Sequence, residues 1–579
     1  MSATHVISTA GHVDHGKSTL VMALTGTNPD RFTEEQERGL TIDLGFASTT
    51  LPSGRTVAII DVPGHVRFLK NMLAGVGAVD ACMFVVSAVE GWMPQSEEHL
   101  RILQLLDVSH GVVALTQVDL VDKETLELAQ LDVGEHLENT FLADAPIIAV
   151  DSISGSGLDE LRAALDLVLD DTPQAADNAQ PRLWIDRAFA AKGSGTVVTG
   201  TLTGGSLKVD DELVVEPGSR PVRVRAIQSL HQSTKKISPG NRVALNLSGL
   251  SHDQVQRGDV IVRNGQWHKT TVFDASLQVL DDLDHALSRR GAHVAYLGSG
   301  EHPVALRVLG PDELSPGEAG FVRLRLKSAY PMLPGDRFVL RESGRSETIG
   351  GGEILDIDPV TKAAEAKPDR SVDRVIAERG WITSDQLFLL TGERRDATIG
   401  EWVVQTDIFD AARTALKERV EQADGLGLPL AELDERHRAL IEFIDDIGID
   451  GTHVRVIDAA DALKDHPFLA ALDATPYAPP GADRYDRAEV RELVRRGLVV
   501  QTEGMYFSAT AVDDAAGRLA DLLAVSPEGV TVSDIREAWD TSRKFALPLL
   551  AHFDSTGVTR RRDDLRIGGP RLAKREQSG

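Results

Sequence analysis

The chain has 579 residues, more than one hydrophobic core normally supports, so we expect roughly three to five domains. A hydrophobic content of 42% and a charged content of 26% are typical of a globular protein, and no run of about 20 apolar residues could cross a membrane. The formal net charge of −27 excludes a protein that binds nucleic acid with its whole surface. Residues 541–579 reverse this balance, with nine Lys and Arg against four Asp and Glu, so we expect RNA contacts there.

The single cysteine, Cys82, excludes an intramolecular disulfide and a cluster of thiolate metal ligands. It lies in the apolar run 81–86, which predicts a buried structural thiol, and it is consistent with a reducing cytosol. Charged and polar residues precede any long apolar run, so we expect no secretory leader and a cytoplasmic location. The sequence gives no reason to expect an oligomer, and we predict a monomer.

The first 170 residues alternate short apolar strands with segments of helical length, an order that predicts βαβ units and a largely parallel sheet. We assign residues 1–172 to this α/β domain, which ends in a polar linker with two prolines at 170–181. The strands are predicted at 6–9, 57–61, 83–88, 112–116 and 147–150.

Short β-branched runs broken by Gly and Pro follow, as in GTVVTGTLTGG and PGDRFVLRESG. This pattern predicts two small antiparallel β-barrels, at 182–266 and 267–358. A second linker is predicted at 359–370.

The remainder, 368–579, is rich in helices and predicts an array of winged-helix units that pack as repeats. A partial copy combines a helix at 487–497 with a hairpin that turns at Glu503 and Gly504, and another copy is predicted to begin near Val372. The last unit, about 510–579, has the predicted order helix 517–525, strand 530–532, helix from Ser533, longer helix 543–556 and hairpin 558–567.

Residues 11–18, GHVDHGKS, match the pattern G-x-x-x-x-G-K-[ST] between a predicted strand and a predicted helix. The glycines let backbone N–H groups face phosphate oxygens, Lys17 reaches the β- and γ-phosphates, and the Ser18 hydroxyl binds Mg²⁺. A plain glycine turn is the alternative. The nucleotide contacts predicted here are Val13, Asp14, His15, Gly16, Lys17, Ser18 and Thr19.

Two further segments complete the predicted phosphate site. In DVPG, residues 61–64, Asp61 can hold Mg²⁺ through water, and the N–H of Gly64 can meet the γ-phosphate. In the polar segment 37–42, Thr41 offers Mg²⁺ a second hydroxyl when a γ-phosphate is present. A loop ordered by γ-phosphate and released on hydrolysis is the usual switch of a GTPase.

Guanine selection is predicted at Thr116, Gln117 and Asp119, which follow the fourth predicted strand. The Asp119 carboxylate can accept hydrogen bonds from the guanine N1–H and exocyclic amine, two donors that adenine lacks in that geometry. Gln117 stands where the N/T-K-x-D pattern has a Lys that stacks over the base, so we expect weaker nucleotide affinity. Ser152 is expected to supply a backbone N–H to the guanine carbonyl.

His65 follows DVPG directly and is the predicted catalytic residue. It would orient the attacking water, a role that glutamine has in many signalling GTPases. Val13 and Leu40 match an apolar pair that keeps such a histidine from the water until activation. A histidine that only packs against the switch is the alternative.

The runs GHVDHGKSTL, ERGLTIDLGFA and DVPGHVRFLKNMLAG resemble translational GTPases of the elongation factor Tu group. The details TIDLGFA and HVRFLKNMLAGV are more similar to selenocysteine-specific elongation factors, as are RLWIDRAFAAKGSGTVVTGTLTGG, GDRFVLRESGRSETIGGGEILD and SRKFALPLLAHFDSTGVTRR. The resemblance covers nearly the whole chain and is weakest from about 395 to 480. It implies that GTP hydrolysis to GDP and phosphate, stimulated by the ribosome, accompanies delivery of selenocysteyl-tRNA at recoded UGA codons.

The resemblance also places an amino-acid pocket on Asp186 and Arg187 in WIDRAF and on Arg242 in NRVALN. A selenol ionises far more readily than a thiol or hydroxyl, so selenocysteine on its tRNA is an anion at neutral pH. A pocket that prefers it to serine needs permanent positive charge, which guanidinium groups supply. An ordinary ion pair on the barrel surface is the alternative.

In the family, the winged-helix array binds the messenger-RNA hairpin beside the recoded codon. The corresponding residues here are Arg543 and Lys544 at the start of the longest helix, and Arg560 and Arg561 in the final hairpin. Such placement could grip the RNA backbone while the helix start faces an unstacked base. A solvated basic tail is the alternative.

Two other functions fit parts of the chain. Another elongation factor Tu-like GTPase could deliver a different aminoacyl-tRNA, but such proteins lack a winged-helix array. A regulator whose winged helices read DNA is a second alternative, and two barrels shaped for a tRNA acceptor end weigh against it.

Overall fold

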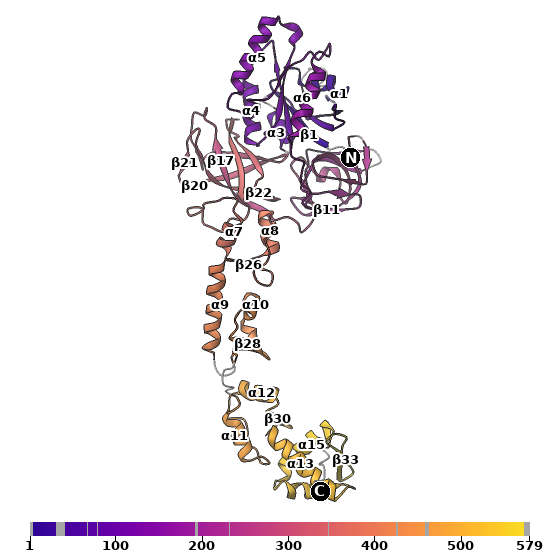
Figure 1. Ribbon diagram of the computed structural model, residues 1–579, viewed down its shortest axis with the longest axis vertical. Helices are drawn as coiled ribbons and strands as arrows, with labels where there is room; N and C mark the ends of the chain where they lie inside the picture. The colour runs from indigo at the N-terminus through magenta and orange to yellow at the C-terminus, as the bar shows by residue number, and fades with distance from the viewer. Residues whose placement is uncertain are drawn as a thin grey trace. The chain divides into compact units, whose positions relative to one another are not determined.

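The computed structural model describes residues 4–29, 41–65, 68–77, 79–191, 195–230, 232–345, 347–423, 427–457 and 463–572. The chain separates into two compact units, Met1–Val404 and Gln405–Gly579 (Figure 1). Unit 1 holds an α/β domain, two β-barrels and a first small helical unit, and unit 2 holds the remaining helices and hairpins. No helix within these described stretches is long and apolar enough to cross a membrane.

The α/β domain is built on a six-stranded sheet of order β2-β3-β1-β4-β5-β6, in which only β2 runs antiparallel to its neighbour. The strands are β1 (Thr4–Ala10), β2 (Gly45–Thr50), β3 (Thr56–Asp61), β4 (Ala81–Ser87), β5 (Gly111–Thr116) and β6 (Ile147–Ala149). The helices are α1 (Lys17–Thr25), α3 (Leu69–Val76), α4 (Pro94–Leu105), α5 (Lys123–Leu137) and α6 (Leu158–Asp170).

All five predicted strands of this sheet are confirmed, and β2 is an addition at the edge. Strand β4 is buried along its whole length, as expected where helices cover both faces of a parallel sheet. Cys82 lies in β4, and burial raises the pKa of its thiol to about 12, which confirms a structural role. The parallel strands end at one edge, where the predicted nucleotide residues follow.

The first barrel is closed by six strands in the order β11-β16-β7-β9-β15-β12, with β12 pairing back to β11. The strands that matter for the site are β7 (Arg182–Trp184), β8 (Arg187–Ala191), β9 (Gly195–Thr203), β15 (Asn241–Ser248) and β16 (Val260–Val262). Its other strands are β10 (Leu207–Lys208), β11 (Glu212–Glu216), β12 (Arg220–Ser229), β13 (Gln232–Thr234) and β14 (Lys236–Ile237).

The second barrel has the closed order β17-β22-β20-β19-β23-β24. Its strands are β17 (Lys269–Val279), β18 (Leu287–Ser288), β19 (His293–Leu297), β20 (Gly300–Leu309), β21 (Glu313–Leu314), β22 (Ala319–Pro331), β23 (Arg337–Glu342) and β24 (Glu347–Asp356). The two antiparallel barrels confirm the predicted fold class.

Apart from Asp170, which is the last residue of α6, the two predicted linkers lack helix and strand, yet contacts hold both to the barrels. Gln180, in the first, is buried and donates through Nε2 to the Gln266 carbonyl at 2.8 Å. In the second, the Thr361 carbonyl accepts from Arg323 at 3.0 Å, and Ala363 is buried. Proline and polar residues prevent regular structure in both, while these contacts fix them to the barrels.

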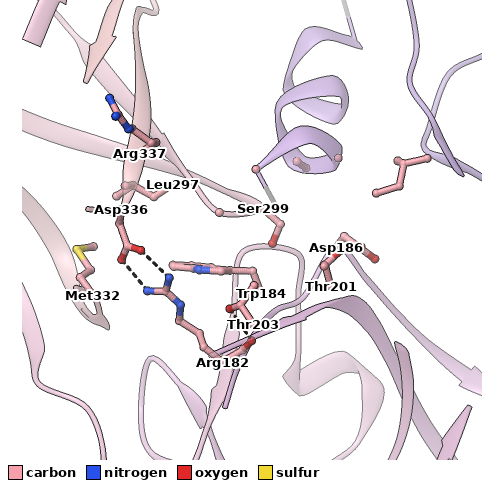
Figure 2. A pocket seen from close by; sticks show the side chains of 15 residues that line it. Arg182, Trp184, Asp186, Thr201, Thr203, Leu297, Ser299, Met332, Asp336 and Arg337 are labelled. Atoms are coloured by element: carbon pink, nitrogen blue, oxygen red, sulfur yellow. Dashed lines mark hydrogen bonds and ion pairs between the residues drawn. The ribbon is translucent and has the colours of Figure 1, made fainter. Parts of the chain in front are cut away.

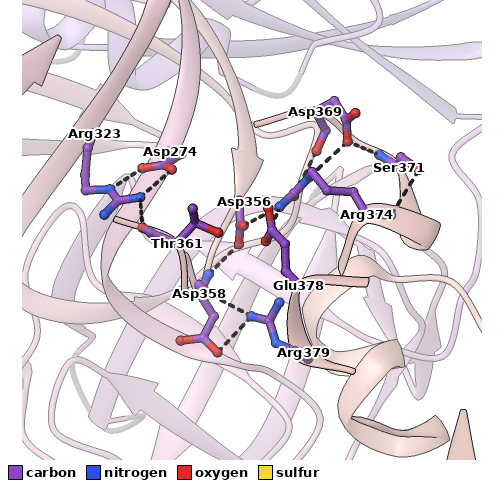
Figure 3. A network of polar contacts seen from close by, with 10 residues as sticks. All are labelled: Asp274, Arg323, Asp356, Asp358, Thr361, Asp369, Ser371, Arg374, Glu378 and Arg379. Carbon is purple, nitrogen blue, oxygen red and sulfur yellow. Dashed lines mark hydrogen bonds and ion pairs between the residues drawn. The ribbon is translucent and has the colours of Figure 1, made fainter. Parts of the chain in front are cut away.

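The first helical unit consists of α7 (Val372–Arg379), β25 (Trp381–Thr383), α8 (Ser384–Thr391) and β26 (Trp402–Val404), and it shares the hydrophobic core of the second barrel. A network of ion pairs reinforces the contact (Figure 3). Arg374 bonds to Asp356 at 2.9 Å and to Asp369 at 3.0 Å, and Arg379 pairs with Asp358 at 3.1 Å. This unit is therefore fixed to the second barrel.

Unit 2 ends in a helix–strand–helix–helix–hairpin domain that confirms the predicted order of the last winged helix: α13 (Ala509–Val525), β32 (Val530–Thr531), α14 (Val532–Ala538), α15 (Arg543–Thr556), β33 (Thr559–Arg562) and β34 (Leu565–Gly568). Helix α13 begins eight residues earlier than predicted, because the Ser508 side chain accepts from the N–H of Ala511 and caps it.

The predicted partial copy is present as α12 (Arg487–Arg495) and the hairpin β30 (Val499–Thr502) and β31 (Met505–Ser508). Glu503 and Gly504 both have positive φ, as the two-residue turn requires. The preceding elements are α9 (Thr406–Glu421), β27 (Leu428–Pro429), α10 (Glu435–Leu440), β28 (Ile447–Asp450), β29 (His453–Val456) and α11 (Pro467–Ala474).

Candidate nucleotide and aminoacyl-tRNA sites

The loop between β1 and α1 has the backbone that a phosphate cradle needs. Gly11 has φ 127°, and a Cβ there would lie 2.1 Å from the Val85 carbonyl oxygen, so only glycine fits. Gly16 has φ 80° at the start of α1. A Cβ at Gly64 would lie 2.4 Å from Lys17 Nζ. The absence of a side chain at Gly64 therefore lets the segment after β3 approach the loop that carries Lys17. The loop thus combines glycines at positive φ with the N-terminus of α1, where a phosphate can be bound.

Lys17 lies inside this cradle and is only 6% exposed. Its ammonium donates to the carbonyls of Gly11, at 3.0 Å, and His12, at 2.5 Å. Burial lowers the pKa of Lys17 to about 8, while Asp61 and Asp14 oppose the shift. The charge is thus held where phosphate oxygens can accept its hydrogen bonds.

The three predicted metal ligands come together beside the cradle. Ser18 Oγ lies 2.7 Å from Thr41 Oγ1 and donates to Asp61 Oδ2 at 2.6 Å. Thr9 Oγ1 donates to the other oxygen of Asp61 at 2.8 Å and orients the carboxylate. Two hydroxyls and a carboxylate are the hard oxygen donors that fit Mg²⁺. Among the described residues, no group of three or more His, Cys, Asp or Glu side chains is arranged to bind a metal ion.

The predicted base-recognition residues lie at the end of β5. Thr116 Oγ1 donates to the His15 carbonyl at 2.7 Å, which ties this loop to the cradle. Gln117 accepts from Ser87 Oγ at 2.6 Å and donates to the Asp14 carbonyl at 3.1 Å. Its amide therefore links the base-recognition loop to the cradle, but unlike a lysine it brings no positive charge.

Two further predicted base contacts lie at the same edge. Asp119 is exposed in the 3-10 turn Val118–Leu120. Ser152 lies in a turn held by Asp151, whose carboxylate accepts from the N–H groups of Ile153, at 2.8 Å, and Ser154, at 3.1 Å. Backbone and carboxylate groups are thus available to a purine base.

His65 lies just after Gly64, and its carbonyl accepts from the N–H of Phe68 at 2.8 Å. Its ring centroid lies 6.0 Å from that of Phe68. Leu40, the predicted partner of Val13, lies outside the described residues.

The side chain of His15 is fully buried, and burial lowers its pKa to about 4. His15 can therefore offer a phosphate only its backbone.

Two residues of α4 also hold the cradle, although no sequence motif predicts them. His99 Nδ1 accepts from the N–H of Gly11 at 3.1 Å, and Gln95 Oε1 accepts from the N–H of Val13 at 3.3 Å. Burial lowers the pKa of His99 to about 3, so the ring stays neutral and can accept. Nothing in the local sequence pattern links positions 95 and 99 to residues 11–13.

The residues predicted for the amino-acid pocket lie where the first barrel meets the α/β domain. Arg242 forms a two-pronged ion pair with Asp186, with bonds of 2.5 and 3.0 Å, and Thr199 donates to the same carboxylate at 2.6 Å. Arg187 donates to the Leu44 carbonyl at 3.0 Å. Asp186 is 4% exposed, so the pair is largely desolvated.

Phe46 of β2 lies close to both arginines and was not predicted. The Arg242 guanidinium lies 3.6 Å from the centre of its ring, and that of Arg187 lies 5.1 Å away. The ring therefore positions both cations. Phe46 is in the quoted TIDLGFA run, but only the contact across domains reveals what it does.

A small cavity of about 80 Å³ lies beside Asp186, where the α/β domain and both barrels meet (Figure 2). Arg182 of β7 bonds to both oxygens of Asp336 at 2.6 Å, which ties the two barrels together. A Cβ at Gly298 would lie 2.3 Å from the Trp184 ring, so the barrels touch too closely for any larger residue.

The residues predicted to contact RNA are exposed on the last winged helix, and together they are called its basic surface below. Arg543 and Lys544 start α15, and Arg560 and Arg561 lie in β33. Arg566 is different, because it is buried and bonds to Asp554 at 3.0 Å. The exposed side chains are available to phosphates.

Models of four protein families match the chain. They are the elongation factor Tu GTP binding domain at residues 3–171, elongation factor Tu domain 2 at 195–262, the selenocysteine-specific elongation factor beta-barrel domain at 275–361, and the elongation factor SelB winged helix at 521–567. With the site geometry, these matches define a GTPase of the elongation factor Tu type.

Whole-chain comparisons are more specific. The chain is 38% identical to the selenocysteine-specific elongation factor of Escherichia coli K12, over 96% of this chain and 97% of the relative. It is 32% identical to that of Desulfomicrobium baculatum, over 97% and 99%. A crystal structure of a bacterial selenocysteine-specific elongation factor, EF-Sec, matches with a TM-score of 0.78 and 25% identity, over 98% of this chain and 100% of the other. The chain belongs to the selenocysteine-specific elongation factor family.

Elongation factor Tu 2 of Streptomyces avermitilis is 32% identical but aligns with only 61% of this chain, although with 96% of its own length. The helical C-terminal part therefore lies beyond that relative, and the alternative of an elongation factor Tu-like protein with another cargo is not favoured.

Proposed function

We propose that this protein, acting as a monomer in the cytoplasm, delivers selenocysteyl-tRNA to the ribosome at recoded UGA codons. The ribosome stimulates it to hydrolyse GTP to GDP and phosphate, and the C-terminal winged helices bind the messenger-RNA hairpin. The single observation that carries the proposal is the pocket in which the guanidinium groups of Arg187 and Arg242 both contact the Phe46 ring, beside the segment that carries Thr41.

For nucleotide binding, the backbone of 13–19 and Lys17 bind the phosphates, while Thr116, Gln117, Asp119 and Ser152 recognise guanine. Bound Mg²⁺ neutralises phosphate charge, and Ser18, Thr41 and Asp61 are the residues that would hold it. Gly64 donates its N–H to the γ-phosphate, and His65 orients the water that attacks it.

For selection of the amino acid, the selenolate accepts hydrogen bonds from guanidinium groups that are already in place. Asp186 fixes Arg242 through two bonds, so little side-chain entropy is lost on binding. Asp186 and Asp43 already pair with Arg242 and Arg187, so serine leaves no bare cation. Serine is uncharged, however, and gains none of the charge-assisted hydrogen bonds that a selenolate makes, each of which contributes roughly 1.5–3 kcal/mol. Two such bonds are enough for discrimination by a factor of about a thousand.

A full-chain variant tests the mRNA part of the proposal in reconstituted translation of a message with a UGA codon and its downstream hairpin. Arg543→Ala with Lys544→Ala should strongly reduce reading of UGA but leave GTP binding intact. Arg413→Ala is the matched control, because that α9 arginine pairs with Asp410 at 3.1 Å away from the basic surface. Unchanged UGA reading in the double variant would favour a factor that works without the hairpin.

A further inference from the structure

Arg257, in the turn before β16, donates to three different parts of unit 1. Its NH2 group donates to Asp43 Oδ1 at 2.5 Å, its NH1 group to Asn71 Oδ1 at 2.6 Å, and its Nε to the Asp186 carbonyl at 2.8 Å. Asp43 is two residues after Thr41, Asn71 is in the helix α3 that follows His65, and Asp186 belongs to the amino-acid pocket. One side chain thus joins both nucleotide-sensing segments to the pocket.

Asn71 and Arg187 also contact the short segment 42–44, which includes Asp43. Asn71 Nδ2 donates to the Ile42 carbonyl at 2.7 Å. Arg187 donates to the Leu44 carbonyl at 3.0 Å and lies 3.4 Å from Asp43. Asp43 therefore has a guanidinium on each side, one from the pocket and one from Arg257.

The geometry restricts how the segment can move. Thr41 Oγ1 lies 2.7 Å from Ser18 Oγ at the proposed metal site, so the position of Thr41 depends on what binds there. Withdrawal of Thr41 would pull Asp43 away from Arg257 and Arg187 together. Arg187 would lose Asp43 and the Leu44 carbonyl as acceptors. Arg257 would lose its bond to Asp43, which helps to keep its Nε within hydrogen-bond distance of the Asp186 carbonyl.

We propose that Arg257 is a positioning residue that couples the nucleotide state to the amino-acid pocket through Asp43 and Asn71. The inference rests on the proposed function and adds a residue and a route to it. With GTP, the held segment keeps Arg187 and Arg242 in place for the selenolate. After hydrolysis, the released segment loosens the pocket and lowers the affinity for the charged tRNA. Linkage requires the charged tRNA to raise the affinity for GTP by the same factor.

A plain structural role for Arg257 predicts a different result. A clamp that only holds two domains together would change tRNA affinity in both nucleotide states equally. A coupling residue changes the ratio between them. The ratio of the Kd for charged tRNA with GDP to that with a non-hydrolysable GTP analogue is therefore the decisive readout.

The experiment measures this ratio for the full-length wild type and for Arg257→Ala and Arg257→Lys. We expect the ratio to fall by about tenfold or more in the alanine variant, since couplings of this kind are typically about 5- to 150-fold. Lysine keeps the charge, but its ammonium cannot reproduce the three hydrogen bonds of the planar guanidinium. The lysine variant should therefore restore little of the wild-type ratio of Kd values. GTP affinity without tRNA should stay within about threefold of the wild type.

Arg263→Ala is the matched control, because this arginine of the same barrel bonds to Asp211 at 3.1 Å and to the Ala179 carbonyl at 3.4 Å. Its ratio should equal that of the wild type. If the Arg257 variants do not fold, Asp43→Asn removes the opposite charge with little change in shape and should lower the ratio in the same way.

An unchanged ratio, or an equal loss of affinity in both nucleotide states, would overturn the coupling role. The proposed function fails separately, if the wild type binds seryl-tRNA as tightly as selenocysteyl-tRNA. In that case the ratio, measured with the charged tRNA that binds, still decides what Arg257 does.

Discussion

The nucleotide site and the amino-acid pocket lie in the same unit but are assembled differently. The nucleotide site takes most of its residues from short runs that follow β1, β3, β5 and β6, which end at one edge of a parallel sheet, and adds Thr41 before β2. The pocket joins strands of two domains, and the ion pair of Asp43 with Arg257 spans 214 residues of sequence. A site at strand ends can be located by motif, whereas a pocket between domains depends on contacts that no local pattern contains.

The largest expected effect tests the pocket. Arg242→Ala should weaken binding of selenocysteyl-tRNA by about a thousandfold, because the selenolate loses a guanidinium donor and faces the Asp186 carboxylate, which is left without its cation. GTP affinity should stay the same, since Arg242 does not belong to the phosphate cradle. Fluorescence titrations with GTP and with charged tRNA give both values. A loss below about threefold would place the selenolate elsewhere.

The next effect tests the nucleotide site. His65→Ala should slow ribosome-stimulated GTP hydrolysis by about 100-fold, because the water that attacks the γ-phosphate would no longer be oriented. Binding of GDP should be unaffected, because the cradle is built by residues 11–18. Single-turnover hydrolysis on programmed ribosomes measures the rate. A wild-type rate would mean that the histidine only packs against Phe68.

A smaller effect concerns the exposed basic surface of the last winged helix. Arg560→Ala and Arg561→Ala should each weaken hairpin binding by a few-fold and lower the slope of log affinity against log salt by about one, as expected for loss of a phosphate contact. Titrations of the RNA hairpin at several salt concentrations measure the slope. If neither the slope nor the affinity changes, the final hairpin is only a solvated tail.

The smallest effect returns to the base-recognition loop. Gln117→Lys should raise the affinity for GTP and GDP alike by about twofold, because a lysine stem covers the base and its charge favours the nucleotide. Ser87 and the Asp14 carbonyl, which now hold the Gln117 amide at 2.6 and 3.1 Å, would lose these bonds. Competition with a fluorescent nucleotide gives both constants. Lower affinity would mean that the amide tether contributes more than a lysine at this position.

The difference between a site built at strand ends and a pocket built between domains explains which residues could be predicted from the sequence. Gly11, Ser18 and Asp61 were within reach because phosphate and Mg²⁺ restrict both residue type and spacing. Gln95, His99 and Arg257 were not, since they act through hydrogen bonds to backbone or side chains far away in the sequence. Helix α13 shows the same limit locally: Ser508 closes a strand and caps a helix, and the pattern revealed only the strand.

The affinity of the GTP-bound protein for one tRNA charged with selenocysteine, compared with the same tRNA charged with serine, tests the central claim most directly. Our account predicts a preference for selenocysteine of about a thousandfold, which Arg242→Ala should remove. Equal binding of the two charged tRNAs would contradict the assignment of Arg187 and Arg242 to the selenolate.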